Sequence, residues 1–216
     1  MSEYVVGVDE VGRGSLVGSA IICAFRSQNS LFDKLPFSVS DSKKINKKKR
    51  EEIYEYFRSN KGFEYNYQII FGKKKFIERF NIHNVVLQSM KQSIILLSKK
   101  SDTIIIDGKF IPSEMKGYKV KSLIKADDKI NQVSAASIIA KVFRDKLLQK
   151  LHSLDGNYQW NKNAGYGTKS HLSAIYTHGV SKYHRTTYQP ISKPVSYTHL
   201  RAHETVLDLV CRLLLE

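Results

Sequence analysis

The sequence predicts an α/β fold, because segments with the periodicity of strands alternate along the chain with segments that have the periodicity of helices. The predicted strands are short runs rich in valine and isoleucine, bounded by glycine or polar residues. The predicted helices are longer and repeat apolar residues about every 3.6 positions. With 216 residues, 42% of them hydrophobic, the chain is long enough to bury one core. We therefore expect a single compact α/β domain.

The first half of the chain predicts three strands and one helix. Residues 4–9 and 18–25 are apolar runs separated by a glycine-punctuated segment, which predicts an opening hairpin. Residues 46–60 have the composition of a helix. Residues 64–71 alternate aromatic or apolar side chains with polar ones, which predicts a third strand.

The second half predicts two more strands and two main helices. Asn81 is placed to cap a helix that reaches about residue 100, and residues 103–107 and 119–124 follow as strands. Residues 130–151 predict a long helix whose small residues at 134–137 would let it pack closely against the sheet. A last helix is expected at about residues 170–178, whereas the basic run Lys73-Lys74-Lys75 is expected to face solvent.

Composition indicates a nucleic-acid partner and a reducing compartment. Lysine and arginine outnumber aspartate and glutamate 35 to 20, a net charge of +15 that favours a polyanion. Charge alone does not separate a nuclease from a passive binder. Cys23 and Cys211 are too few and too far apart for a disulfide framework or a cysteine zinc site. No leader or long apolar run is visible, so we expect a cytoplasmic protein with no membrane partner.

Chemistry is concentrated where the first predicted strand ends, in the segment Asp9-Glu10-Val11-Gly12-Arg13-Gly14. Adjacent carboxylates suit hard divalent cations, and phosphodiester hydrolysis gains from two such ions about 3.5–4 Å apart. Consecutive strand residues point to opposite faces, so both acids would reach one site only if the alternation breaks at Glu10. The glycines would let backbone amides approach a sugar-phosphate chain, and Arg13 offers planar donors. The alternative is a turn closed by a local ion pair.

Two further acids stand at ends of predicted elements. Asp107 closes the strand at 103–107 and would lie beside Asp9 if the two strands are neighbours, although an Asp-Gly pair also forms simple turns. Asp127 precedes the long helix, where an acid can instead cap the helix amides.

The hexapeptide at residues 9–14 resembles the signature segment of the ribonuclease HII family, and further segments extend this resemblance over about residues 4–190. These segments are Asp41-Ser42-Lys43-Lys44, residues 134–145, Gly165-Tyr166-Gly167-Thr168 with His171, and His184-Arg185 followed by Tyr188 and Pro190. The resemblance implies a ribonuclease H-like three-layer fold, with a central mixed five-stranded sheet flanked by helices and a C-terminal helical segment.

The activity that this resemblance implies is an endonuclease that hydrolyses the RNA strand of RNA–DNA hybrids and cuts 5′ of ribonucleotides embedded in duplex DNA. It would use two ions, Mg²⁺ or Mn²⁺, and leave 3′-hydroxyl and 5′-phosphate ends. The residues it carries over are as follows: Asp9, Glu10, Asp107 and Asp127 as catalytic metal ligands, Gly12, Arg13 and Gly14 as readers of the 2′-hydroxyl, Tyr166 against the deoxyribose after the ribonucleotide, and Lys43 and Lys44 on phosphates.

The resemblance also covers residues outside the carboxylates and the glycine-rich turn. Lys141 and Arg144 are candidates for a place near phosphates, and His171 and His184 are expected to be ordinary buried histidines. The family has a basic residue where this chain has Ala164, and the spacing of Lys162 argues against it as a substitute.

Residues 195–216 match nothing in the family and look like adaptor-derived sequence, so the catalytic domain is expected at residues 1–194. A sliding clamp is a further candidate partner, and we expect a monomer. Two alternatives remain: the related ribonuclease HIII, against which Arg13 and the short N-terminus argue, and a basic protein that binds nucleic acid without cutting it.

Overall fold

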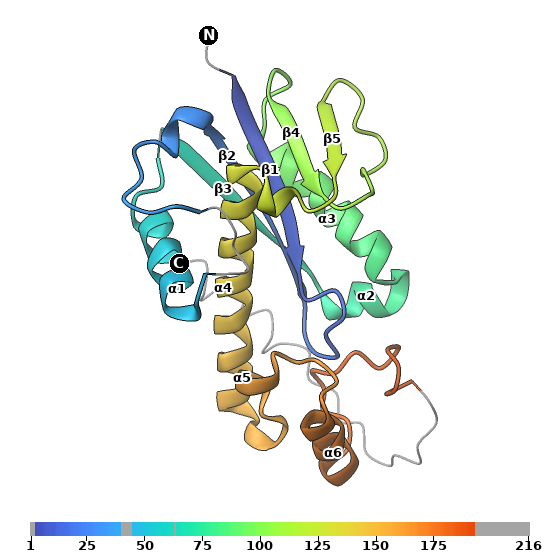
Figure 1. Cartoon of the computed structure of the whole chain (residues 1–216). Helices are drawn as coiled ribbons and strands as arrows, with labels where there is room; N and C mark the ends of the chain where they lie inside the picture. The colour runs from blue at the N-terminus through green and yellow to red at the C-terminus, as the bar shows by residue number, and fades with distance from the viewer. Residues whose placement is uncertain (1–2, 40–44, 63, 193–216) are drawn as a thin grey trace.

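The computed structural model describes residues 3–39, 45–62 and 64–192, and it has a five-stranded mixed sheet in the order β3-β2-β1-β4-β5 (Figure 1). Strands β1, β2 and β3 pair antiparallel, whereas β4 and β5 run parallel to β1. The mixed five-stranded sheet predicted from the sequence is therefore confirmed. The strands are β1 (Tyr4–Val11), β2 (Ala20–Gln28), β3 (Tyr65–Gly72), β4 (Thr103–Asp107) and β5 (Lys119–Leu123).

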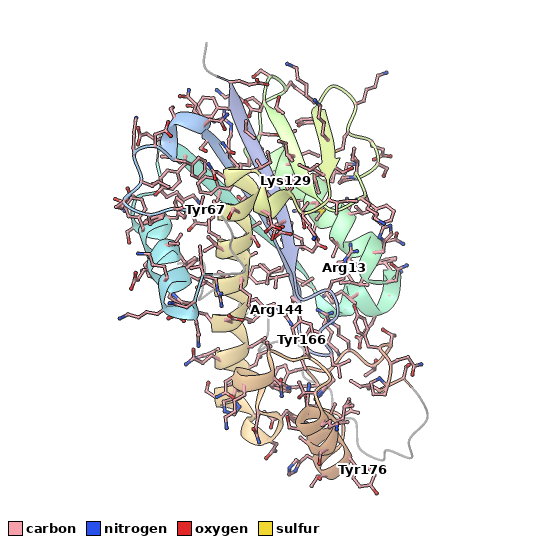
Figure 2. The ribbon with its side chains drawn as sticks, viewed as in Figure 1. Arg13, Tyr67, Lys129, Arg144, Tyr166 and Tyr176 are labelled. Atoms are coloured by element: carbon pink, nitrogen blue, oxygen red, sulfur yellow. The ribbon has the colours of Figure 1, made fainter. Side chains whose placement is uncertain are left out.

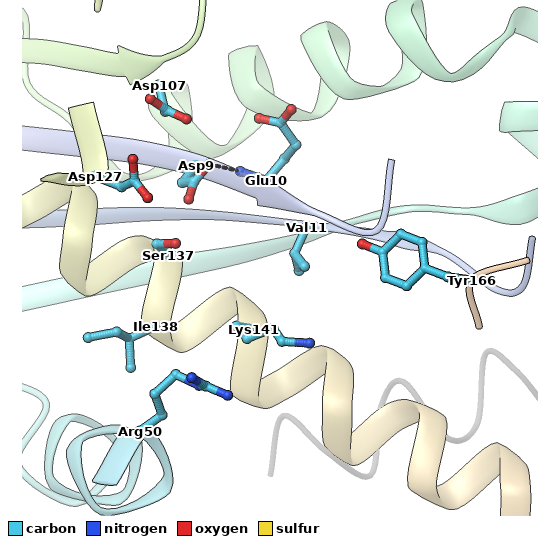
Figure 3. A pocket seen from close by; sticks show the side chains of 10 residues that line it. All are labelled: Asp9, Glu10, Val11, Arg50, Asp107, Asp127, Ser137, Ile138, Lys141 and Tyr166. Carbon is cyan, nitrogen blue, oxygen red and sulfur yellow. Dashed lines mark hydrogen bonds between the residues drawn. The ribbon is translucent and has the colours of Figure 1, made fainter. Parts of the chain in front are cut away.

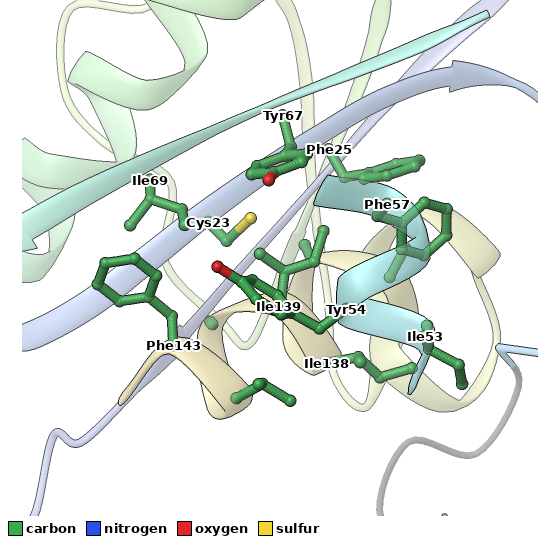
Figure 4. Close-up of a cluster of buried hydrophobic side chains, with 14 of the residues drawn as sticks. Cys23, Phe25, Ile53, Tyr54, Phe57, Tyr67, Ile69, Ile138, Ile139 and Phe143 are labelled. Atoms are coloured by element: carbon green, nitrogen blue, oxygen red, sulfur yellow. The ribbon is translucent and has the colours of Figure 1, made fainter. Parts of the chain in front are cut away.

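Helices cover both faces of the sheet. They are α1 (Lys47–Ser59), α2 (Lys74–Phe80), α3 (Ile82–Leu97), α4 (Asn131–Leu154), α5 (Trp160–Asn163) and α6 (Lys169–His178). One core lies between the sheet and the pair α1 and α4, with the aromatic rings of Phe25, Phe57 and Tyr67 at its centre (Figure 4). A second core lies between the opposite face and α2 and α3. This is the expected three-layer arrangement, and the C-terminal helical segment is α6.

A third, smaller core forms beyond the end of the sheet. The last turns of α4, the short helix α5 and α6 enclose Leu151, Trp160 and Ile175, and Leu16 and Val17 from the β1–β2 connection complete it. Figure 1 shows these elements below the sheet, at the end of the long helix α4. The connection between β1 and β2 is thus held by residues more than 130 positions away in the sequence.

Helix α2 was not predicted from the sequence. In the run Lys73-Lys74-Lys75, Lys75 is exposed as expected and Lys73 is half-buried, while α2 begins at Lys74 and buries Ile77 in the second core. Lys74 is half-buried and pairs with Glu78 at 3.3 Å. A seven-residue helix with one buried apolar residue leaves too weak a periodic signal to be seen. The Asn81 cap is confirmed, since its side chain accepts a hydrogen bond from Asn84 N.

None of the helices in the described part of the chain combines the length and the apolar character that crossing a membrane requires.

Gly7, in the middle of β1, is where α4 lies closest to the sheet. A Cβ atom at this position would stand 2.2 Å from Gln132 C and 2.2 Å from Val133 N, both backbone atoms of α4. The next turn of the helix is Ser134-Ala135-Ala136-Ser137, so small side chains continue the close approach. The predicted tight packing of this helix is confirmed, and glycine is the residue that makes it possible.

We predict that Gly7→Ala lowers the free energy of unfolding by at least about 2 kcal/mol, because the backbone of α4 cannot move away from one added methyl group without leaving its core. Urea unfolding of the purified protein measures this change. Gly62→Ala is the matched control, since a Cβ at Gly62 meets nothing within 4 Å. Equal unfolding midpoints for the two variants would show that α4 does not depend on Gly7.

Candidate active site

The four predicted acidic residues line one pocket. Asp9 and Glu10 are near the end of β1, Asp107 is the last residue of β4, and Asp127 lies in the 3-10 turn η2 (Ala126–Asp128) that leads into α4. The pocket has a volume of about 410 Å³, and Tyr166 stands at its rim (Figure 3). Three segments far apart in the sequence therefore bring carboxylates to one place.

The sheet produces this meeting because β1 runs farther than β4. The parallel pairing of β1 with β4 ends at Val8 and Ile106, whereas the pairing of β1 with β2 continues to Val11. Beyond Val8 the β4 side of the strand is open, and Asp107 points into that opening from the end of its own strand (Figure 3).

The expected break in the alternation of β1 is absent. Asp9 pairs with Cys23 and Glu10 with Ile22 in a regular antiparallel register. The two acids leave opposite faces of the strand, and they reach the same pocket because it lies at the open edge of the strand. Regular pleating is therefore compatible with a shared site once the neighbouring strand has ended.

Burial and mutual repulsion disturb the ionisation of the first two acids. Burial, followed by the charges of Glu10 and Asp107, raises the pKa of Asp9 to about 8, although its contact with Ser137 acts in the opposite sense. Burial also raises the pKa of Glu10 to about 7, against the effect of Arg13, whose Nε lies 3.3 Å from Glu10 Oε1. The protein around the pocket therefore does not stabilise a full negative charge on both acids at neutral pH, and without cations they retain protons there.

Asp107 and Asp127 are held in place by the turn that precedes α4. Asp107 Oδ1 accepts a hydrogen bond of 2.7 Å from Ala126 N, so it joins β4 to this turn rather than merely closing an Asp-Gly turn. Asp127 is 2% exposed. The N-cap of α4 is Ile130, which makes no side-chain cap, so neither Asp127 nor its neighbour caps the helix. Asp127 therefore does not stand at the N-cap position that the capping alternative requires.

The donor set fits hard divalent cations. Carboxylate oxygens are the ligands that Mg²⁺ and Mn²⁺ accept, and four crowded carboxylates, of which Asp9 and Glu10 have raised pKa values, favour positive charge between them. Within the described residues, no group of three or more His, Cys, Asp and Glu is already arranged tightly enough to hold an ion. The residues that could hold cations are therefore gathered but not closed into a cage.

Two buried arginines hold the segment at residues 12–19, which we call the glycine loop. Arg144 is fully buried and donates hydrogen bonds to Val17 O and Ser19 O. Arg185 donates from Nε to Gly18 O at 2.8 Å and from Nη1 to Arg13 O at 3.0 Å. Inward-facing carbonyls thus anchor the loop. Arg144 is therefore not available to phosphates. The expectation from the sequence that it lies near them is wrong.

Burial and the nearby charge of Arg185 lower the pKa of Arg144 to about 9. Among the described residues, neither arginine forms a salt bridge, and Arg144 Nε and Arg185 Nη2 have no hydrogen-bond partner. Figure 2 shows Arg144 beside Arg13 and Tyr166, where α4 meets the end of the sheet. A concentration of positive charge therefore lies directly beneath the glycine loop.

Tyr166 lies against this loop and is 41% exposed, so it is not a core aromatic residue. A Cβ at Gly14 would lie 3.8 Å from Tyr166 Cε1. Leu16 N donates to Gly165 O at 2.8 Å, which ties the two segments together. The predicted 2′-hydroxyl readers and Tyr166 are therefore neighbours beside the carboxylates. Lys43 and Lys44, the predicted phosphate contacts, lie outside the described residues.

Three residues of the pocket were missed or only partly anticipated. Ser137 contacts Asp9, and Arg50 enters the lining from α1. Lys141 lines the pocket one helical turn after Ser137, as its proposed place near phosphates requires. The spacing of Ser137 and Lys141 by four residues was a signal for a shared helix face, but nothing in the sequence indicates that Arg50 reaches the same place.

Comparison with known proteins gives one consistent result. The family model described as Ribonuclease HII matches residues 6–191. A ribonuclease HII of Pelagibacter ubique is 46% identical over 190 residues, which are 88% of this chain and 98% of that protein. A ribonuclease HII of Wolbachia pipientis is 39% identical over 195 residues, covering 89% of this chain and 93% of the relative.

Solved structures show the same fold. The ribonuclease HII in the Archaeoglobus fulgidus complex with PCNA superposes with a TM-score of 0.71 at 22% identity, over 93% of this chain and 98% of that chain. Ribonuclease H2 of Pyrococcus horikoshii also gives 0.71, at 24% identity, over 88% and 96%. A ribonuclease HIII bound to Mn²⁺ gives 0.62 at 17% identity, over 82% and 70%.

We predict that Asp9→Asn stabilises the metal-free protein, and that the gain grows as the pH rises from about 4 to 8. The pKa of Asp9 is about 8 in the fold against 3.8 ordinarily, so in this window the unfolded chain releases a proton that the folded chain keeps. Wild-type stability therefore falls with rising pH, and asparagine escapes this loss.

The gain should reach at least about 1 kcal/mol near pH 8, the equivalent of one pKa unit. Urea unfolding in the presence of a chelator measures it, with the exposed Asp128→Asn as the control. A gain that is the same at pH 5 and pH 8 would contradict the assignment of the effect to Asp9 ionisation.

We also predict that Gly12→Ala lowers the free energy of unfolding by about 2 kcal/mol, because Gly12 has a φ of +88° and a Cβ there would stand 2.4 Å from Arg144 Nε. Gly14→Ala in the same loop should cost less than about 1 kcal/mol, since its nearest neighbour is 3.8 Å away. Thermal unfolding of both variants tests this, and a larger loss for Gly14→Ala would disprove it.

Proposed function

The chain belongs to the ribonuclease HII family, so it is a type 2 ribonuclease H endonuclease, and we propose that Asp9, Glu10, Asp107 and Asp127 are the acids with which it hydrolyses phosphodiesters. The observation that carries this assignment is their convergence in one pocket beside the glycine loop and Tyr166. The proposed reaction cuts RNA in RNA–DNA hybrids, and cuts 5′ of single ribonucleotides in duplex DNA, leaving a 3′-hydroxyl and a 5′-phosphate.

The four carboxylates would hold Mg²⁺ or Mn²⁺, which when bound activate water and stabilise the charge on the leaving oxygen. Asp9 and Asp107, on adjacent strands, and Asp127, on the turn before α4, face the space where the scissile phosphate would lie. The crowding of these carboxylates, which contributes to the raised pKa of Asp9, would favour cation binding and would repel a phosphate that brings no cation. The Mn²⁺ bound to the ribonuclease HIII neighbour is consistent with a divalent requirement, and Mg²⁺ or Mn²⁺ is our proposal for this chain.

The glycine loop and Tyr166 would select the nucleotide. Arg185 and Arg144 draw the carbonyls of residues 13 and 17–19 inward, which leaves the outer side of the loop free to meet the sugar. Arg13, with 40% of its side chain exposed, would donate to a 2′-hydroxyl or the adjoining phosphate. Tyr166 would pack on the deoxyribose that follows.

A second hollow adjoins the pocket, and its lining holds three lysines and one acid, Asp145, which pairs with Lys141 at 2.7 Å. This hollow of about 260 Å³ is lined by Lys47, Lys141 and Lys162, and Lys141 belongs to both hollows. Ala164 also lines this second hollow, and its side chain carries no charge. We propose that Lys162, on α5, supplies the phosphate contact that Ala164 does not, contrary to the inference from its spacing.

A sliding clamp is the protein partner we propose, since a ribonuclease HII neighbour was crystallised with PCNA. Residues 195–216, which we propose to be adaptor-derived rather than part of the catalytic domain, lie outside the described residues. The ribonuclease HIII alternative is not favoured, because the relatives are ribonucleases HII and the HIII neighbour overlaps less of its own length. The alternative of a binder that does not cut is likewise not retained.

The test is cleavage of a DNA duplex containing one ribonucleotide, in Mg²⁺ or Mn²⁺, with an all-DNA duplex as the uncut control. We predict that Asp9→Asn and Asp127→Asn each lower kcat at least about a hundredfold, since each removes charge that stabilises the reacting centre. Asp128→Asn is the matched control, because Asp128 is exposed beside the buried Asp127. Wild-type rates in Asp9→Asn and Asp127→Asn would overturn the assignment of the catalytic acids.

A further inference from the structure

Two histidines meet in the small core behind Tyr166. His171, on α6, and His184, in the segment after it, are both fully buried, and their Nε2 atoms lie 3.0 Å apart. Trp160 Nε1 lies 3.1 Å from His171 Nε2, and Tyr158 stacks on Trp160 with ring centroids 5.0 Å apart. The mechanism described above makes no use of this pair.

The hydrogen bonds around the pair allow one arrangement of protons. The Tyr166 carbonyl, 2.8 Å from His171 Nδ1, can only accept, so His171 Nδ1 carries a proton. Trp160 Nε1 can only donate, so His171 Nε2 is an unprotonated acceptor. His171 is therefore neutral and holds its proton on Nδ1.

The same reasoning fixes the second ring. Ser181 N donates to His184 Nδ1 at 3.0 Å, so that nitrogen accepts, and the Ser181 hydroxyl, 2.9 Å from the same nitrogen, can only be a second donor to it. The proton of neutral His184 is then on Nε2, from which it donates to His171 Nε2, whose single lone pair it shares with Trp160 Nε1. A second proton on either ring would place two N–H groups face to face, with no acceptor between them. In agreement, burial and the neighbouring His171 lower the pKa of His184 to about 3, and burial lowers the pKa of His171.

Both ends of this chain of hydrogen bonds reach elements that meet the nucleotide. At one end, His171 grips the carbonyl of Tyr166, whose ring lines the catalytic pocket. At the other end, the backbone of His184 pairs with Val17 of the glycine loop, and Arg185 N donates to Leu16 O at 2.7 Å. The two histidines thus join the Tyr166 segment to the glycine loop from behind.

We propose that His171 and His184 are positioning residues that fix Tyr166 relative to the glycine loop, and so set the preference for a ribonucleotide followed by DNA over continuous RNA. This inference rests on the proposed role of Tyr166. A tyrosine that packs on the sugar after the ribonucleotide discriminates only if its backbone is held within a fraction of an ångström. Tyr166 is on a loop, and the histidine bond supplies the rigidity that a loop lacks.

The measured quantity is a selectivity ratio, kcat/KM for a single embedded ribonucleotide divided by kcat/KM for an RNA–DNA hybrid of the same sequence. His171→Gln places an amide near the position of Nε2 and loses the bond to Tyr166, so the ratio should fall about tenfold or more. His171→Asn places its amide near the position of Nδ1, keeps a donor for Tyr166, and should restore the ratio to within about threefold of wild type.

His184 offers the reciprocal pair. His184→Gln keeps a donor toward His171 and should retain the ratio, whereas His184→Asn keeps only the Ser181 contact and should lower it. His178→Gln, at the exposed end of α6, is the control for a histidine change on the same helix. Equal ratios for the Gln and Asn variants at position 171, whether normal or reduced, would overturn the proposal, because a merely structural role would not distinguish them.

Two measurements separate this inference from the proposed role of Tyr166. If Tyr166→Ala leaves the ratio unchanged, the role of Tyr166 itself is wrong. If Tyr166→Ala lowers the ratio, His171→Gln should lower it no further in that background. On the wild-type protein, ¹⁵N chemical shifts of the imidazoles at pH 7 should show His171 protonated on Nδ1 and His184 on Nε2. Any other pair of protonation states would overturn the proposal without requiring that a variant fold.

Discussion

The contact of α4 with β1 at Gly7 is the constraint on which the rest of the structure depends. Because the helix backbone lies against the strand backbone, the turn that starts the helix is brought down to the level where β4 ends. Ala126 N then reaches Asp107, Asp127 enters the pocket, and Ser137 contacts Asp9. The absence of a side chain at Gly7 therefore lets α4 bring these residues to the pocket. The same helix continues past the sheet and carries Arg144 beneath the glycine loop.

The glycine loop is held in a way that is unusual for a loop. Backbone carbonyls are ordinarily satisfied by amides or water, but here Arg144 and Arg185 supply the donors from inside the protein. Two guanidinium groups without a carboxylate partner among the described residues are costly to bury. Arg185 lies in the segment that follows α6, so the shape of the glycine loop near residue 12 depends on a segment more than 160 positions away.

The sequence predicted the strands, the main helices and the residues that gather at the site, because each leaves a local signal. The acids follow apolar strands, and the small residues at 134–137 indicate a helix that packs closely. The features that could not be predicted depend on the relative lengths of neighbouring strands and on contacts between elements. Asp9 and Glu10 share a site although the alternation of β1 is intact, because β4 ends before β1 does. The sequence of β1 does not show where its neighbour β4 will end.

The burial of Arg144 did leave a signal, since it lies on the helix face of Ala140, Leu147 and Leu151. Because its side chain is charged, the sequence was nevertheless interpreted as placing it near phosphates. His171 and His184 were expected to be satisfied buried histidines, and they are. Their contact with each other could not be foreseen, because they are 13 positions apart and α6 ends between them. Hydrogen-bond partners of single polar residues are a property of the tertiary fold rather than of local sequence.

Charge in the site is separated rather than balanced. The pocket collects acids, of which Asp9 and Glu10 have raised pKa values, while the loop beside it is supported by Arg144 and Arg185, whose pKa values are lowered by burial. Apart from the contact between Glu10 and Arg13, the two groups do not neutralise each other, because a strand end and a loop backbone lie between them. Such an arrangement is unfavourable in the free protein and favourable once cations fill one side and a phosphate chain the other. The close backbone contact at Gly7 and the hydrogen bonds around the two histidines support the acids and the loop from opposite sides, so the site keeps its shape while it is unfavourably charged.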